Sequence, residues 1–196
     1  QLANTGKFLG YFTSNKSKLT PQQMFLKLIY TKEQEKKSEL LNTLPSTFSN
    51  VFVDTNGAAY STCMGIGNDL LKKHSTNGTN MLGNVKTSSA LTDVTANKDG
   101  IIYASDSHGM IWVYTSQGEV IFQLGAEAAD KDISGLFTSL TTIAVDNSGN
   151  IWTADGEKGY LQSFTPTEYA TTIFKALKEY ENGDYKEALT DWNYVL

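Results

Sequence analysis

Arginine is absent from this chain of 196 residues, whose 16 basic side chains are all lysines set against 21 acidic ones. The guanidinium fork that reads base edges is therefore missing, and with a net charge of −5 we expect no nucleic-acid partner. Cysteine occurs once, at Cys63, which excludes an intrachain disulfide and a cysteine-rich metal site. No apolar run approaches the roughly 18 residues of a membrane-spanning helix, and no signal-peptide pattern is present.

A pattern of apolar strand, glycine turn and second strand occurs three times, starting at Phe48, Leu91 and Leu140. In each copy the turn glycine follows the first apolar residue by nine positions, and an aromatic residue follows the glycine by three. These pairs are Gly57 and Tyr60, Gly100 and Tyr103, and Gly149 and Trp152. The copies start 43 and 49 residues apart, a period typical of β-propeller blades with four strands each.

The spacing therefore predicts a mainly β fold with three four-stranded antiparallel blades. The side chains expected to be buried on the inner strands are Val51, Val53, Val94, Ile143 and Val145. The first blade is expected at 48–82, the second at 91–125 and the third from residue 140, followed by no clear fourth strand. Residues 125–139 read as a loop, and we expect Trp112 and Trp152 to pack between blades.

Residues 6–12 match residues 118–124, the expected outer strand of the second blade. They are either the tail of a missing blade or a strand that closes the ring on the last blade. Three and a half blades do not close a ring comfortably, and open sheet edges invite pairing with another chain. We therefore expect this chain to be a piece of a larger protein that can self-associate through exposed edge strands.

Two segments have helical rather than strand periodicity. Residues 13–47 contain a helix start at Thr20 and Pro21 and a second cap at Thr31, which predicts a mainly helical stretch at 21–43. After Pro166, two further helices are expected, separated at Gly183, with Asp184 capping the second. The predicted organisation is the outer strand of a truncated blade at 1–12, a helical insertion at 13–47, three blades at 48–165 and an α-helical hairpin at 166–196.

The three blades resemble NHL repeats, and the match is best in the third. It covers residues 135–137, Leu140, residues 143–146 and residues 149–155. Asp106 and Asp155 stand where this family has an aspartate at the end of the second strand. The resemblance implies a partial propeller of NHL type with a helical insertion.

The last 21 residues resemble a tetratricopeptide repeat, a helical hairpin built on alternating small and large side chains. The matching residues are Ala176, Tyr180, Gly183, Tyr185, Ala188, Leu189 and Trp192. One such repeat does not stand alone, because each repeat covers the apolar face of its neighbour.

The order of these parts resembles one family of Gram-positive bacterial proteins, in which an extracytoplasmic NHL propeller precedes tetratricopeptide helices and a Yip-type membrane domain. The resemblance implies a module at the bacterial cell surface, tethered through membrane segments outside this chain. The expected function is non-enzymatic binding or scaffolding of a protein or carbohydrate ligand, with no cofactor, metal site or catalytic residue.

The ligand is expected on the face that carries the inter-blade loops and the turns between second and third strands, because loops on a rigid scaffold gather binding residues. The candidate ligand-binding residues there are Asn50, Asp93, Asp106, Ser107, His108 and Asp155. The helical insertion is expected on the same face. Asp106 and Asp155 have a second interpretation, in which they only bond neighbouring backbone amides.

The alternative function is a metal-dependent, gluconolactonase-like hydrolase. Such propellers hold a divalent cation such as calcium on oxygen ligands, and Asn50, Asp93 and Asp106 imitate part of that set. No glutamate occupies a matching position. His108 lies beside Ser107 in a turn, and adjacent residues do not form a catalytic triad by themselves.

Overall fold

In the computed structural model, which describes residues 6–7, 11–15, 20–38, 46–65 and 69–196, the chain separates into units at 1–47 and 48–196. Each unit is described by itself below. Across the described ranges, no helix has both the length and the apolar character needed to cross a membrane.

The first unit contains two short helices, α1 (Pro21–Ile29) and α2 (Lys32–Lys37). A reciprocal cap starts α1: Gln23 N donates to Thr20 Oγ1 at 3.3 Å, and Thr20 N donates to Gln23 Oε1 at 2.8 Å. The helix therefore begins where the Thr-Pro pair predicts it. Residues 39–43 of the predicted helical stretch, and residues 8–10 of the predicted strand at 6–12, lie outside the described residues. The placement of the insertion on the inter-blade face stays a prediction.

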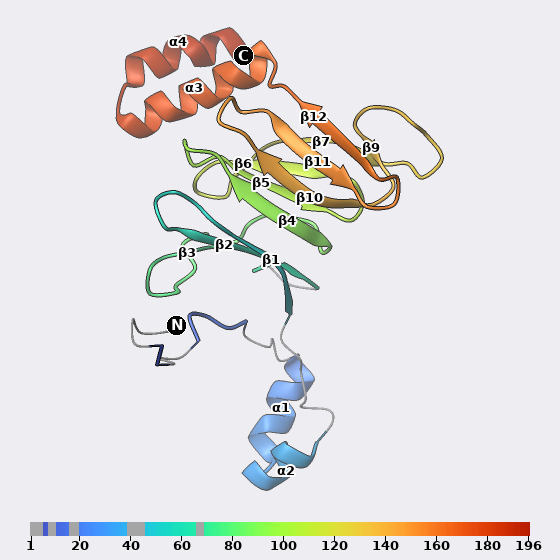
Figure 1. Cartoon of the computed structure of the whole chain (residues 1–196). Helices are drawn as coiled ribbons and strands as arrows, with labels where there is room; N and C mark the ends of the chain where they lie inside the picture. The colour runs from blue at the N-terminus through green and yellow to red at the C-terminus, as the bar shows by residue number, and fades with distance from the viewer. Residues whose placement is uncertain (1–5, 8–10, 16–19, 39–45, 66–68) are drawn as a thin grey trace. The chain divides into compact units, whose positions relative to one another are not determined.

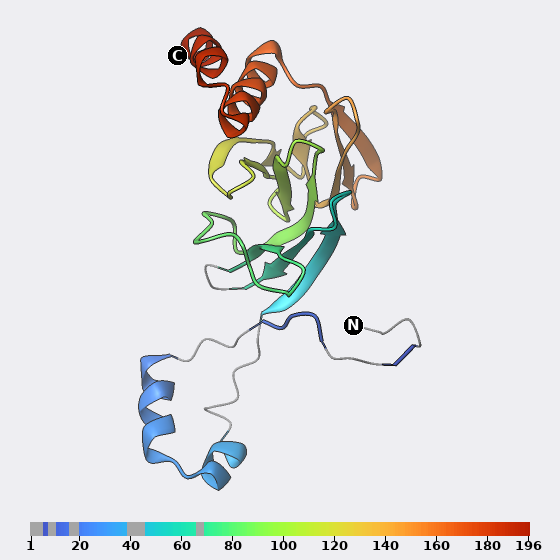
Figure 2. The same cartoon turned by 90° about the vertical axis from the view of Figure 1, so that its left-hand side faces the viewer.

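The second unit holds three successive antiparallel sheets, which follow one another side by side (Figures 1 and 2). Blade one is β1 (Thr47–Val53), β2 (Ala59–Met64) and β3 (Leu71–His74). Blade two is β4 (Leu91–Ala96), β5 (Ile102–Asp106), β6 (Ile111–Tyr114) and β7 (Val120–Leu124). Blade three is β10 (Leu140–Val145), β11 (Ile151–Asp155) and β12 (Tyr160–Phe164).

Two apolar clusters lie between these sheets. The first packs Tyr60 and Leu71 of blade one against Leu91, Val94 and Ile102 of blade two. The second packs the opposite side of blade two on blade three, and it contains Tyr103, Ile111, Leu140, Ile143 and Ile151. Sheets of consecutive antiparallel strands that stack face to face in chain order form a partial β-propeller.

The prediction of four strands in every blade is wrong for the described parts of blades one and three, although blade three lacks the fourth strand that its sequence also failed to indicate. After β3 the chain turns at Ser75 to Gly78, but the described residues beyond the turn form only one bridge, between His74 and Asn80. The Asn80 side chain accepts from Lys73 N at 3.2 Å and from Leu82 N at 3.1 Å, so it replaces the ladder that a strand would make. Between blades two and three, β8 (Ala126–Glu127) and β9 (Leu136–Phe137) form a short parallel pair inside the predicted loop.

The predicted burial of the inner strands is correct for blades two and three in part, but wrong for blade one. Val94 and Ile143 are buried, at 2% and 4% exposed, and Val145 is half-buried. Val51 and Val53 are instead 65% and 59% exposed, because Phe52 points into the first cluster and its neighbours point to the opposite face. Trp152 is 45% exposed, so it does not pack between blades, whereas Trp112 is half-buried against the first cluster.

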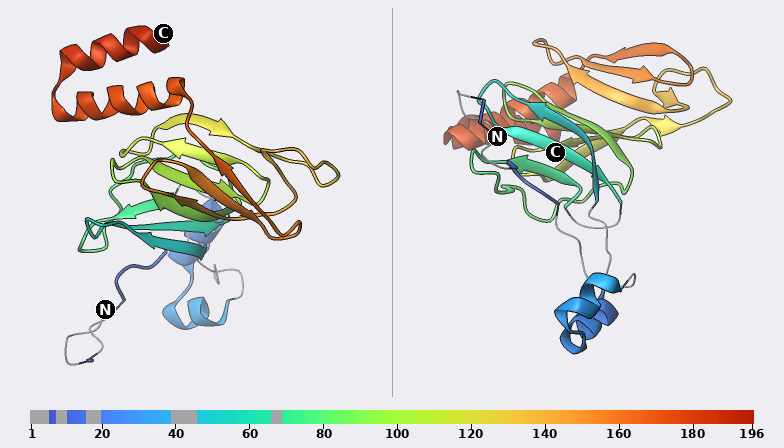
Figure 3. Two further views of the ribbon diagram at one scale, coloured as in Figure 1. Left: turned by 45° about the horizontal axis from the view of Figure 1, so that its top comes forward. Right: turned by 60° about the horizontal axis from the view of Figure 1, so that its bottom comes forward.

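The C-terminal segment forms α3 (Glu168–Asn182) and α4 (Tyr185–Val195), an antiparallel hairpin (Figure 3, left). Thr167 caps α3, and Gly183 ends it with a φ of 89°, a left-handed conformation that glycine adopts without strain. Asp184 precedes α4 but makes no side-chain cap bond, contrary to the prediction. Phe174 of α3 packs on the rings of Tyr103 and Phe122, so the hairpin is docked on blade two.

Val94 and Val51 occupy the same position in their repeats and provide a matched test of this burial pattern. We expect Val94→Ala to lower the free energy of unfolding by about 1–3 kcal/mol, because it removes buried apolar surface and leaves a cavity. We expect Val51→Ala to change the free energy of unfolding of the single chain by less than about 0.5 kcal/mol, since that side chain is exposed there. Chemical denaturation of both variants measures the difference, and equal losses would contradict the described burial.

Candidate functional site

One turn geometry closes the first hairpin of every blade, at residues 54–57, 97–100 and 146–149. The leading side chain, from Asp54, Asn97 or Asp146, accepts the backbone N–H groups two and four residues later at 2.8–3.0 Å. The glycine at the fourth position donates back to the first carbonyl and has a φ of 82–84°. This is a three-residue hairpin loop whose left-handed position requires glycine.

The aromatic residue six positions after the leading residue belongs to the same unit. The second oxygen of Asp54 accepts from Tyr60 OH at 3.3 Å, and that of Asp146 accepts from Trp152 Nε1 at 3.1 Å. Asp106 repeats the arrangement in the second hairpin of blade two, where Trp112 Nε1 donates at 3.1 Å. The glycine-to-aromatic spacing visible in the sequence thus reflects a turn that holds its own aromatic ring.

The three first-hairpin turns and helix α3 line a cleft of about 640 Å³. Its apolar lining includes Phe52 from β1, Tyr103 from β5 and Phe174 from α3, while Pro166 leads into the helix. The exposed tip of the blade-three turn, Asn147 and Ser148, contributes polar groups. The volume is in the range of small-ligand pockets, which combine an apolar lining with a few polar groups.

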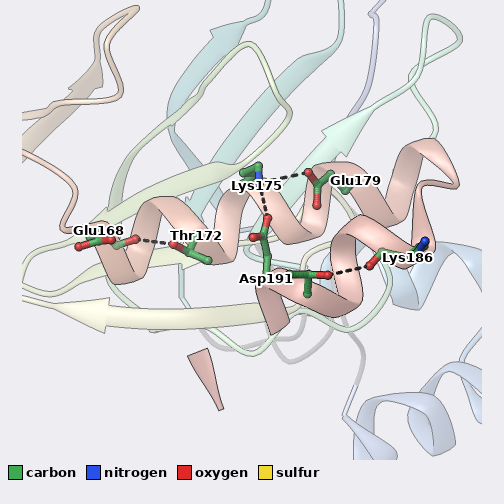
Figure 4. Close-up of polar contacts among 7 residues, drawn as sticks. Glu168, Thr172, Lys175, Glu179, Lys186 and Asp191 are labelled. Carbon is green, nitrogen blue, oxygen red and sulfur yellow. Dashed lines mark hydrogen bonds and ion pairs between the residues drawn. The ribbon is translucent and has the colours of Figure 1, made fainter. Parts of the chain in front are cut away.

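Most charged groups around the cleft are already paired within the protein. Lys178 Nζ lies 2.5 Å from Asp99 Oδ1. Lys175 Nζ lies 2.7 Å from Asp191 Oδ2 and 3.4 Å from Glu179 Oε1, as Figure 4 shows. Among the residues that line the cleft, Lys98 is the cation outside these pairs. A ligand in the cleft would therefore contact mainly apolar surface and uncharged polar groups, and few unpaired charges.

Three lining side chains have shifted pKa values, and for Lys175 the bond to Asp191 raises the pKa. The hydrogen bonds from the Asn150 amide and the Trp152 indole lower the pKa of Asp146 to about 2. Burial, and then the nearby Asp99 carboxylate, raise the pKa of Tyr103 to about 12. Asp146 is thus an anion satisfied by its own turn at neutral pH, and Tyr103 is a neutral phenol.

Asn50 and Asp93, two of the predicted ligand-binding residues, are brought together on neighbouring inner strands. Asp93 is 5% exposed; its Oδ1 accepts from the Asn50 side-chain amide and from Val94 N, the latter at 2.7 Å. Its Oδ2 accepts from Thr142 Oγ1 at 2.5 Å and from Ile143 N at 2.9 Å. Asn50, Asp93 and Thr142 are each the third residue of their repeat, so one carboxylate joins the three blades.

Asp106, Ser107 and His108 form the turn between β5 and β6, at the opposite end of the strands from the cleft. Asp106 is buried, and its Oδ1 accepts from His108 N at 2.9 Å and from Met110 N at 3.1 Å. The side chains of Ser107 and His108 are exposed. Their predicted role in binding stays a prediction, whereas the carboxylate of Asp106 has a structural role.

Asp155 ends β11 as Asp106 ends β5, and it is 2% exposed. Its Oδ2 accepts from Thr138 N at 2.7 Å, while its Oδ1 accepts from Glu157 N at 3.0 Å and Lys158 N at 2.9 Å. Burial opposes ionisation of this carboxyl, but the N–H groups of Lys158, Thr138 and Glu157 outweigh burial, and its pKa lies below its ordinary value. Asp155 thereby ties the inter-blade loop to the second strand of blade three.

A serine–histidine pair that sequence reasoning did not single out lies in blade one. Ser61 Oγ is 2.8 Å from His74 Nε2, and these side chains are 3% and 2% exposed. Burial lowers the pKa of His74. Because the pair is buried between β2 and β3, it connects strands rather than facing a substrate.

Within the described part of the chain, no three His, Cys, Asp or Glu side chains are grouped as metal ligands would be. The oxygens of Asp93 already accept protein donors. The alternative function, a metal-dependent hydrolase, stays a prediction.

No protein-family model and no curated protein matches this chain. Among solved structures, it is similar to the computationally designed Ika4 protein, with a TM-score of 0.47 and 13% identity over 64% of this chain and 70% of that one. It is also similar to a streptogramin B lyase, with a TM-score of 0.45 and 14% identity over 66% and 44% of the two chains. The WD40 β-propeller domain of Doa1 gives 0.44 and 12% over 67% and 40%.

The chain spans less than half the length of the lyase and WD40 chains, and all three TM-scores are below 0.5. These similarities carry no argument about activity. The partial propeller is shown by the order and packing of its own sheets.

The acid dependence of stability provides a test of the Asp155 contacts. Because the folded-state pKa is lowered, the contribution of Asp155 is present above the ordinary value of 3.8 and is lost as the pH falls through the folded-state value. We expect Asp155→Asn to destabilise the protein by about 1–3 kcal/mol at neutral pH, since it removes charge-assisted hydrogen bonds. Denaturation at several pH values should show this difference shrink below about pH 4.

The matched control is Asp132→Asn, an exposed aspartate in the loop between blades two and three. We expect little change in stability at any pH. A loss in Asp155→Asn that is the same at acidic and neutral pH would contradict the electrostatic account.

Proposed function

We propose that this chain is a non-enzymatic binding module that holds a neutral carbohydrate in the cleft between the first-hairpin turns and α3. The observation that carries the proposal is the cleft of about 640 Å³, positioned by three identical turns on a rigid scaffold. In this proposal the blades are of NHL type and the C-terminal hairpin is of tetratricopeptide type.

The chemistry of the lining favours a hydroxyl-rich, uncharged ligand. Lys175, Lys178 and Asp99 are ion-paired, and Asp54 and Asp146 are held by their own turns. A strongly charged ligand would have to displace these pairs, whereas a sugar can place an apolar ring face on the lining and its hydroxyls on the turns. Asn147, Ser148 and Thr55 are exposed polar residues placed to meet such hydroxyls.

The cleft lies at one end of the strands, and the inter-blade loops, where the sequence predicts the ligand, lie at the other end. On the favoured face, Asn50, Asp93, Asp106 and Asp155 use their polar atoms to join strands and loops. We therefore assign the ligand to the cleft and leave Ser107 and His108, whose side chains are exposed, as the candidates on the opposite face.

The cellular setting of the proposal comes from the resemblance of the chain's parts to cell-surface proteins. A module outside the bacterial cytoplasm, held near the membrane by segments beyond this chain, would meet carbohydrate polymers directly. A protein ligand is the competing proposal, and it is favoured if no sugar probe binds.

Paired tryptophan substitutions at equivalent turn positions test the proposal. Ser148 and His108 are each the third residue of an Asx-x-x-Gly turn, one at the cleft and one at the opposite end. With chitotriose, cellotriose and maltotriose as probes in ligand-observed NMR and calorimetry, we expect at least one probe to bind. We expect Ser148→Trp to abolish that binding by filling the cleft and His108→Trp to leave it unchanged.

Loss of binding in His108→Trp alone would move the site to the face with the inter-blade loops. Binding of none of the three probes, in a folded protein, would overturn the assignment to neutral sugars. Far-ultraviolet circular dichroism checks that both variants keep the secondary structure of the wild type.

A further inference from the structure

Two packed interfaces inside this chain show what each face of a blade is built to contact. Blade one meets blade two through Tyr60 and Leu71, and blade two meets blade three through Tyr103 and Ile111. Tyr60 and Tyr103 are the aromatics three residues after the turn glycine, and they are 0% and 1% exposed. Leu71 and Ile111 pair with the residue two positions beyond each aromatic, and both are fully buried.

In blade three the residues at these two positions, the aromatic and the aliphatic one, are exposed. Trp152 replaces the tyrosine and is 45% exposed, and Leu161 replaces the aliphatic residue and is 75% exposed. Leu161 pairs with Ala154, two positions beyond Trp152, so the register matches the other blades. The indole is held in place by its bond to Asp146 at 3.1 Å, so little ordering is needed when a partner covers it.

The opposite face of each blade, on its innermost strand, contacts the preceding blade. This face is covered in blades two and three and exposed in blade one. Val94 receives blade one and is 2% exposed, and Ile143 receives blade two and is 4% exposed. Val51 is their equivalent in blade one and is 65% exposed, with Val53 at 59% and Phe48 at 46% on the same strand. Stacked repeats need polar outer faces at their ends to remain separate, and these two ends are apolar.

We propose that the Trp152–Leu161 face of blade three packs on the Val51–Val53 face of blade one in a second copy of this chain. The occupant is identified by the interface itself: the internal contacts show that this kind of face meets the β1-equivalent side of another blade. The side chains that define the two faces are all apolar, so no charge has to be buried at these positions when the faces meet. The contact is heterologous, so a pair of chains retains one free face of each kind, one on each copy, unless the two copies close on each other.

Charge insertion on each face separates this arrangement from its alternatives. Light scattering across a wide concentration range should show wild-type protein in species heavier than one chain. We expect Leu161→Asp alone and Val51→Asp alone to abolish these species, because each damages one side of every interface. An equal mixture of the two variants should recover a two-chain species, since Val51→Asp keeps an intact blade-three face and Leu161→Asp keeps an intact blade-one face.

The matched control is Leu189→Asp on α4, where the leucine is 60% exposed but lies outside both faces. We expect it to associate like the wild type. A wild-type monomer at every concentration would overturn the proposal, as would dissociation by Leu189→Asp alone. Sensitivity to Leu161→Asp without sensitivity to Val51→Asp would show contact between like faces and would also overturn it. Thermal melts confirm that each variant is folded, as expected for substitutions at exposed positions.

Discussion

The carboxylate of Asp93 is the interaction on which the arrangement of the blades depends. It accepts hydrogen bonds from the side chain of Asn50 on β1, from Thr142 and Ile143 on β10 and from its own strand at Val94. A buried charge is tolerated only when its oxygens are satisfied, and here the donors come from both neighbouring sheets. The same bonds therefore fix the spacing and register of three inner strands. Because those strands run on into the first-hairpin turns, the Asp93 contacts also decide where the cleft lies.

Much of the fold could be predicted from the sequence, because the repeat combines a turn that requires glycine with an aromatic held by the same turn. The nine-residue spacing located three hairpins, and the Thr-Pro pair located the start of α1. The open faces could not be predicted: strand alternation shows that two faces differ but not which one a neighbour covers. That is why Val51 and Trp152 were expected to be buried and are exposed. The side chain of Asn80, which replaces a fourth strand with two local bonds, gives no sequence signal either.

The candidate site was predictable only in part. Reasoning from topology grouped Asn50 and Asp93 on one face, and the structure brings them into direct contact. The cleft was missed because its fourth wall is α3, and the docking of α3 depends on the tertiary contact of Phe174 with Tyr103 and Phe122. The identical spacing of the three Asx-x-x-Gly turns was the available signal, since equivalent turns of stacked blades converge at one end. The repeated aspartates, which looked like candidate ligand groups, are used to close turns and join strands.

The docking of α3 has a consequence for communication between the two ends of this unit. One wall of the cleft belongs to the blades and the other to a helix that continues into α4, with Phe174 and Lys178 on the boundary. In the proposed function a ligand would contact both walls, so its binding and the docking of the helix would be thermodynamically coupled. Within the proposed function, substitutions at Phe174 that loosen the helix would therefore weaken ligand binding even if they left the turns unchanged.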